Sequence, residues 1–180
     1  MNDISCELAK LHILTGSDFV RQLKLIVAEG GFHPVENETC VFSLGGEKGE
    51  DYDNLMNAAR KAVCHGYQVY LLPNPNRIRS ADFILVQHGI FKMYYLKTIS
   101  GKSSVMNRLK ESVGQANHVL LNLTTDYNAT ALARCIKKYF ELNPLAMEVM
   151  IFKGTKVIVV TPKSVKDKMF FNTFTKRYNK

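Results

Sequence analysis

The chain has 180 residues, 46% hydrophobic and 22% charged, a composition typical of a globular protein with an apolar core. No stretch approaches the roughly 18 consecutive apolar residues of a membrane span, which excludes an integral membrane helix. The formal net charge of +8 is unevenly distributed: residues 1–60 carry −5, residues 61–150 carry +6 and residues 151–180 carry +7. A basic surface favours nucleic-acid partners, because Lys and Arg displace counterions condensed on the phosphate backbone.

The cysteines indicate neither a disulfide framework nor a zinc site. All four are spread along the chain without a Cys-x-x-Cys pair, and the five histidines are equally dispersed. The first residues of the chain lack the basic and apolar regions of a secretory signal. We therefore expect a protein of the reducing cytoplasm.

The first part of the chain favours helices. A helix capped at Ser17 or Asp18 is predicted up to the glycine pair that begins at Gly30, with a shorter helix before it. The glycine-rich residues 45–49 lack the Gly-Lys-Ser/Thr ending of a phosphate-binding loop. We therefore predict an N-terminal helical extension over residues 1–45.

The remainder alternates helical and strand patterns, which predicts the α/β (α+β) class, a mixed central sheet flanked by helices. The clearest signal is a hairpin, because two apolar runs of strand character flank the two-residue turn His88-Gly89. From this hairpin, the connection through a helix to the next strand is expected to run parallel and right-handed. A strand is expected at 39–44, at the end of the extension. The elements expected after it are strands at 67–72, 82–87, 90–97, 118–123, 148–152 and 155–160, and helices at 51–65, 103–115 and 128–142.

We predict one α/β domain over residues 46–162 and a basic C-terminal tail over residues 163–180. The tail mixes lysines with Met169, Phe170, Phe171 and Phe174, which makes it an amphipathic segment. Such a tail can dock on the domain through its aromatic rings, contact RNA or bind an acidic partner. Docking on the domain is our expectation.

The predicted hairpin carries an acidic residue at one end and a basic residue at the other. Asp82 opens one strand and Lys97 ends the other, so the chain reversal brings both residues toward one end of the sheet. The simplest interpretation is structural, with Asp82 capping a turn and Lys97 as a solvated strand end. The functional interpretation needs support from the surrounding sequence.

Four segments between residues 50 and 160 supply that support. They are Gly66-Tyr67-Gln68-Val69-Tyr70-Leu71-Leu72-Pro73, Ala81-Asp82-Phe83-Ile84, Tyr94-Tyr95-Leu96-Lys97-Thr98 and Gln115-Ala116-Asn117-His118-Val119-Leu120-Leu121-Asn122-Leu123. In order and spacing this set resembles the PD-(D/E)XK-like tRNase domains of bacterial contact-dependent growth inhibition toxins, the C-terminal domains of CdiA proteins. The resemblance implies a nuclease-like fold and a metal-dependent RNA endonuclease, in particular a tRNase.

The resemblance also implies roles for individual residues. Asp82 and, from the preceding helix, Asp53 would hold Mg²⁺ or another divalent cation, and Lys97 would orient and activate the attacking water. The expected partners are tRNA or another nucleic acid and an immunity-type protein. RNA phosphates would be bound by basic and hydroxyl residues after the lysine, namely Thr98, Lys102, Ser103, Ser104, Arg108 and Lys110.

Two departures from the family pattern leave the chemistry open. Tyr95, which we keep in the candidate catalytic set, stands in place of the second metal-binding carboxylate, and Asn122 replaces an Asp of the later strand. The metal is then held by the two remaining acids, or RNA is cleaved without metal, or the fold has lost catalysis. Cleavage without metal would need a general base, for which His118 near Lys97 is the candidate. The alternative functions are a catalytically degenerate nucleic-acid-binding or interaction module and, more weakly supported, a structural protein.

Overall fold

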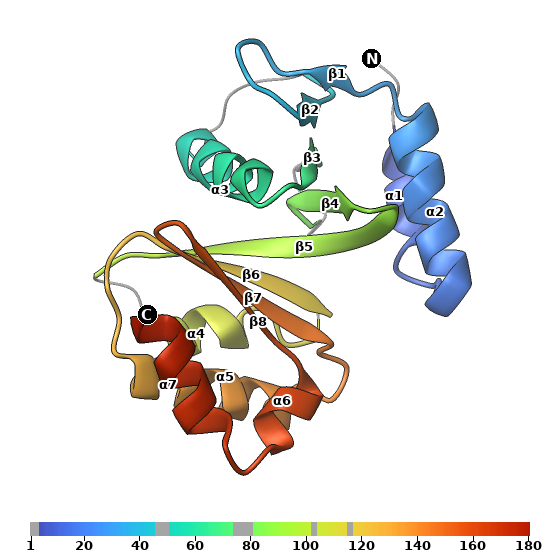
Figure 1. The fold of residues 1–180 in the computed structure, drawn as a ribbon. Coiled ribbons are helices and arrows are strands. Elements are labelled where there is room, and N and C mark those ends of the chain that lie inside the picture. The colour runs from blue at the N-terminus through green and yellow to red at the C-terminus, as the bar shows by residue number, and fades with distance from the viewer. Residues whose placement is uncertain (1–3, 46–50, 74–80, 102–103, 115–116) are drawn as a thin grey trace. The chain divides into compact units, whose positions relative to one another are not determined.

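The computed structural model describes residues 4–45, 51–73, 81–101, 104–114 and 117–180 (Figure 1). Contacts between residues divide the chain into two compact units, Met1–Tyr94 (unit 1) and Tyr95–Lys180 (unit 2). The boundary falls inside one strand, β5 (Ile90–Ile99). The segment boundaries predicted after residues 45 and 162 are different boundaries, and they stay predictions.

In its described residues, unit 1 combines three helices with short strands. Its strands pair in sequence order, antiparallel except for the parallel pair β2 and β3. Small residues on one side of α3, Ala58, Ala59 and Ala62, are buried, as are Val69 of β3 and Ile84 of β4. The elements are α1 (Ser5–Lys10), α2 (Gly16–Glu29), β1 (His33–Pro34), β2 (Val41–Ser43), α3 (Tyr52–Cys64), β3 (Gln68–Leu71), β4 (Phe83–Gln87) and the first half of β5.

The hairpin predicted about His88-Gly89 is confirmed. His88 has a φ of 49° and Gly89 a φ of 73°. Positive φ at both loop residues is the requirement of a type I′ turn, whose twist matches that of the flanking strands. Phe83 of β4 pairs with Tyr94 of β5, which fixes the register of this hairpin.

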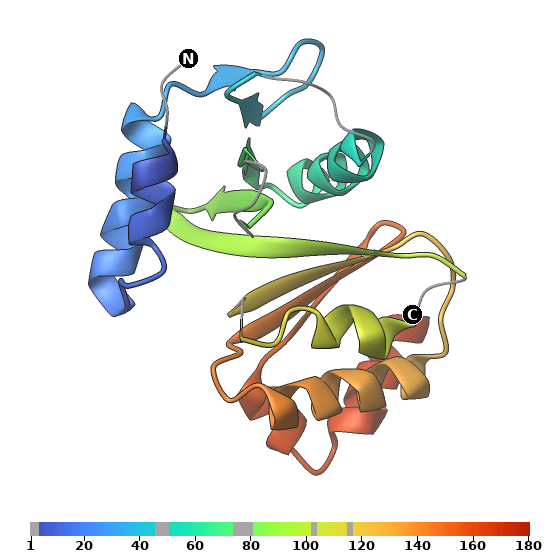
Figure 2. The same ribbon diagram turned by 180° about the vertical axis from the view of Figure 1, so that it is seen from behind.

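Unit 2 is a layer of strands with helices packed on one face. The strand pair β5 and β6 is parallel, as predicted, and so is the pair β6 and β7, whereas β7 and β8 are antiparallel. Figures 1 and 2 both show α4, α5 and α7 on the same face of the strands. The elements are the second half of β5, α4 (Val105–Lys110), β6 (His118–Leu123), α5 (Ala129–Leu142), β7 (Glu148–Lys153), β8 (Lys156–Val160), α6 (Pro162–Lys166) and α7 (Phe170–Asn179).

Along the hydrogen-bonded ladder the strands follow the order β1 to β8, with both parallel and antiparallel pairs. This mixed sheet flanked by helices confirms the α+β class predicted from the sequence. No helix among the described residues is long and apolar enough to cross a membrane.

The basic C-terminal segment docks on unit 2. Three aromatic side chains of α7, Phe170, Phe174 and Tyr178, recur every four residues and are buried. This spacing places them on one face of the helix, which packs against α5. The predicted docking of the tail through its aromatic rings is thus confirmed.

One helix is shorter than its pattern predicts. The helix expected over residues 103–115 is described only as α4, which ends at Lys110. Beyond it, the N–H of Ser112 bonds to the carbonyl three residues earlier, at Leu109, and Gly114 has a φ of 74°. The backbone therefore tightens into turns and leaves the helical conformation at this glycine.

Candidate functional site

The two predicted metal-binding acids both lie in unit 1. Asp82 is half-buried in the bend before β4, where its N–H donates to the Tyr94 carbonyl and its carbonyl accepts from the Leu72 N–H, each at 3.0 Å. Asp53 is exposed in the first turn of α3. Lys97 belongs to unit 2. The grouping of these three residues in one site therefore stays a prediction.

The described side chains do not form a metal site by themselves. Within the ranges that the structure describes, no group of three or more His, Cys, Asp and Glu side chains is arranged to hold a metal ion. Mg²⁺ can be held by one or two carboxylates when substrate phosphates and waters complete its shell. Mg²⁺ at this site thus stays a prediction.

Lys97 lies on the helix-bearing face of unit 2. Side chains alternate along β5, so Tyr95, Lys97 and Ile99 share one face. The Lys97 Nζ atom is 3.2 Å from the Glu111 Oε2 atom, just beyond the end of α4. The lysine side chain is 22% exposed, so its ammonium group is held by protein contacts yet reaches solvent.

A second cation shares the Glu111 carboxylate. The Arg108 Nη1 atom is 3.5 Å from the same oxygen, Oε2. Partial burial raises the pKa of the Glu111 carboxyl, but the hydrogen bond and charge of Lys97 and the charge of Arg108 lower it more, so the pKa lies below its ordinary value. Two cations around one carboxylate leave this cluster, Lys97, Arg108 and Glu111, with a net positive charge.

The other residues predicted to bind RNA are dispersed. Ser104 caps α4, its Oγ atom accepting from the Asn107 N–H at 3.4 Å, and Lys110 is exposed at the end of that helix. Thr98 pairs with Asn122, so its side chain points to the face opposite Lys97. The predicted contributors Lys102 and Ser103 lie outside the described residues.

The register of β5 and β6 contradicts the proximity expected for His118 and Lys97. Lys97 pairs with Leu121, and Tyr95 pairs with Val119. Because directly paired residues share a face, His118 points to the opposite face from Lys97. His118 is therefore not positioned as a general base beside Lys97.

Tyr95, the residue at the second carboxylate position, is a packed side chain. It is 8% exposed and lies on the same face of β5 as Lys97. The phenol at this position stands where the family pattern has a carboxylate, so that carboxylate ligand is absent here. The carboxylate nearest to Lys97 in unit 2 is instead that of Glu111, which motif comparison did not identify.

Glu111 was missed because its role depends on a contact across elements. In the sequence it is one acid in a basic segment, three residues after Arg108. That spacing does predict a helical ion pair with Arg108. Its contact with Lys97, 14 residues away, requires the packing of α4 on β5.

The two units differ strongly in charge. Unit 2 contains 15 Lys and Arg and five Asp and Glu, for a formal net charge of +10, whereas unit 1 contains nine and 11, for −2. The Lys97 cluster therefore lies in the part of the chain that is best suited to bind polyanions.

No protein-family model and no curated protein matches the chain. Among solved structures, it is similar to a chain of the CdiA-CT/CdiI toxin and immunity complex from Burkholderia pseudomallei, with 16% sequence identity and a TM-score of 0.45. The match covers 67% of this chain and 99% of that chain. A likeness this loose assigns neither a fold nor a function.

Proposed function

We propose that this protein binds RNA through unit 2 and cleaves the RNA backbone beside Lys97. The observation that supports the proposal is the Lys97, Arg108 and Glu111 cluster within a unit of net charge +10. Cations partly fixed by protein contacts require little reorganisation when they bind a phosphate. They also stabilise the negative charge that builds on phosphate oxygens during cleavage.

Lys97 and Arg108 would contact the scissile or a neighbouring phosphate, while Glu111 positions both cations. Glu111 is a poor general base, because its lowered pKa reduces its affinity for a proton at neutral pH. The proton acceptor of the reaction is thus expected outside this cluster. Asp53 and Asp82 are the predicted ligands of a divalent cation, and a chelator arm in the assay tests that prediction.

The resemblance of the sequence motifs to tRNases selects tRNA as the first substrate to test. The same resemblance suggests an immunity-type protein that suppresses the activity. Both the substrate and this partner are predictions. They are checked by cleavage of purified tRNA and by loss of cleavage when a cognate inhibitor is added.

A second candidate function is RNA binding without cleavage. It is favoured by Tyr95, which replaces a carboxylate ligand and is packed at 8% exposure. The ion pair between Lys97 and Glu111 also favours it, because a lysine held in this way can bind a phosphate without taking part in a reaction. The two functions make different predictions for the same assay.

The test incubates the protein with total tRNA in Mg²⁺ or Mn²⁺ and separately with a chelator. We expect cleavage that is lost in Lys97→Ala and retained in Lys138→Ala. Lys138 is a matched control, because its Nζ atom is 3.3 Å from Glu141 in another lysine–glutamate pair of unit 2. Salt-dependent binding without cleavage in any metal would select the second function. Absence of both binding and cleavage would refute the proposal.

A further inference from the structure

Strand β8 presents an unpaired edge. It stands last in the strand order, and no strand in the described part of the chain pairs with its outer side. Lys153 pairs with Lys156 across the two-residue turn Gly154-Thr155, so hydrogen bonding to β7 alternates from Lys156 onward. Ile158 therefore directs its N–H and C=O to β7, whereas Val157 and Val159 direct theirs outward.

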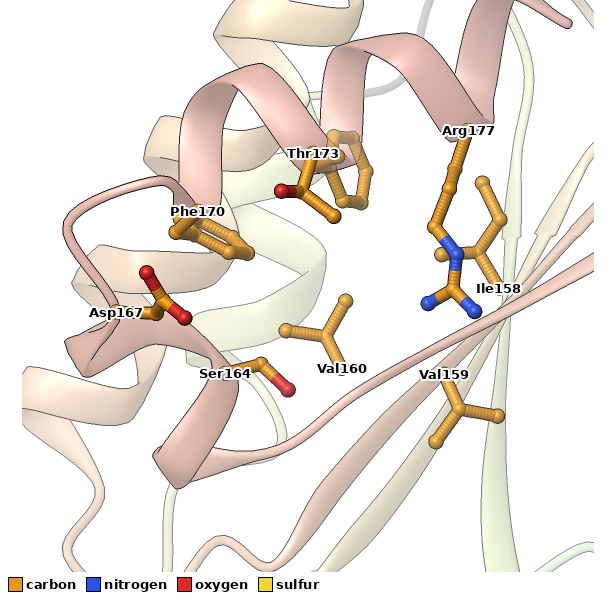
Figure 3. A pocket seen from close by; sticks show the side chains of 9 residues that line it. Ile158, Val159, Val160, Ser164, Asp167, Phe170, Thr173 and Arg177 are labelled. Carbon is orange, nitrogen blue, oxygen red and sulfur yellow. The ribbon is translucent and has the colours of Figure 1, made fainter.

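A cavity of about 180 Å³ lies beside this edge, between β8, α6 and α7 (Figure 3). Its apolar wall includes Ile158, Val160, Phe170 and Phe174. An added strand next to β8 would direct alternate side chains to the helix-bearing face, where this cavity opens. The cavity thus has the composition and place expected of a pocket for one apolar side chain of such a strand.

An arginine that has no hydrogen-bond or ion-pair partner in the described part of the chain lies at the same place. Figure 3 shows the Arg177 guanidinium extending from α7 toward Ile158 and Val159. Among the described residues, no hydrogen bond or ion pair involves Arg177. The acid that also lines the cavity, Asp167, accepts a hydrogen bond from the Met169 N–H at 2.7 Å, just before α7.

The surroundings of the edge are strongly basic. Residues 151–180 contain eight Lys and Arg and one acid. This excess disfavours pairing of two copies of the chain through β8, because like charges would be brought together. It favours an acidic occupant.

We propose that β8 binds an extended acidic segment of a partner protein, which adds to the sheet as a further strand. The backbone of the segment pairs with the outward groups of Val157 and Val159. One apolar side chain enters the cavity, and a carboxylate pairs with Arg177. A peptide fits these features better than RNA does, because outward backbone donors and acceptors beside an apolar cavity match a strand.

The probe is a labelled eight-residue peptide, Thr-Val-Thr-Glu-Thr-Val-Thr-Glu, which places Val and Glu on the same face of a strand, compared with the same peptide carrying Lys in place of Glu. Fluorescence anisotropy with the full chain should show saturable binding of the acidic peptide alone. Arg177→Ala should weaken this binding about tenfold, since a charge-assisted hydrogen bond is lost. Arg134→Ala is the matched control and should have no effect, because Arg134 is exposed on α5 away from the cavity.

A second variant distinguishes binding by strand addition from binding by charge attraction alone. Val159→Pro removes an outward N–H but no bond to β7, and edge strands tolerate proline. Circular dichroism should stay unchanged while peptide binding is lost, and Val159→Thr should bind normally. In the original chain, the peptide should slow amide hydrogen exchange at Val157 and Val159.

Equal binding to the Val159→Pro variant, or unchanged exchange at the two valines, would overturn the proposal in favour of general charge attraction. No binding of the acidic peptide would also overturn it. If Arg177→Ala lowered only tRNA affinity, the edge would belong to an RNA-binding surface instead. These outcomes are independent of whether the protein cleaves RNA.

Discussion

The Lys97–Glu111 ion pair gives the most informative prediction, because it separates a structural from a functional lysine. The variants are Lys97→Met, Glu111→Gln and the double variant. At 3.2 Å, two unit charges attract by about 1.3 kcal/mol in bulk water. The side chains are 22% and 47% exposed, so solvent screening and ordering reduce the net coupling to about 0.5–1 kcal/mol.

The coupling is measured by urea denaturation of the four proteins in a double-mutant cycle. The folded-state pKa of Glu111 is lowered, so its contribution to stability is present above its unfolded-state pKa and lost as the pH falls through the folded-state pKa. We expect the coupling at pH 7 and none in strong acid. Carboxyl NMR should show a higher Glu111 pKa in Lys97→Met.

A coupling of zero at pH 7, or one that persists in strong acid, would refute this reasoning. The same variants also test the site. If Lys97 binds phosphate, Lys97→Met lowers RNA affinity, whereas Glu111→Gln raises it by removing a negative charge beside two cations. If the pair is only structural, neither variant changes RNA affinity.

Two further predictions concern stability. Tyr178→Phe should lower the free energy of unfolding by about 1–2 kcal/mol, because the half-buried Tyr127 N–H loses its acceptor, the Tyr178 hydroxyl at 3.0 Å. Urea denaturation checks this, and Tyr127→Phe, which keeps that bond, should cost less. His88→Asn should raise the free energy of unfolding by about 0.5 kcal/mol, because Asn adopts the left-handed φ of 49° more readily. A lower thermal midpoint in that variant would contradict the assigned turn.

The sequence by itself determined most of the elements of secondary structure. The turn His88-Gly89, the helix over 129–142 and the docking of the C-terminal aromatic residues follow from signals confined to short stretches of chain. Glycine in a two-residue turn and apolar residues every three or four positions act through local backbone and side-chain geometry. The parallel pairing of β5 and β6 followed as well, because a helix connects the two strands.

The tertiary structure decided which side chains meet. Pairing of Lys97 with Leu121 places Thr98 and His118 on the opposite face, and a shift of one residue in that register would have reversed the result. The contacts of Lys97 with Glu111 and of Tyr178 with the Tyr127 N–H join residues 14 and 51 positions apart. Such contacts depend on strand register and helix packing, which the pattern of a single sequence leaves unspecified because many registers satisfy the same alternation.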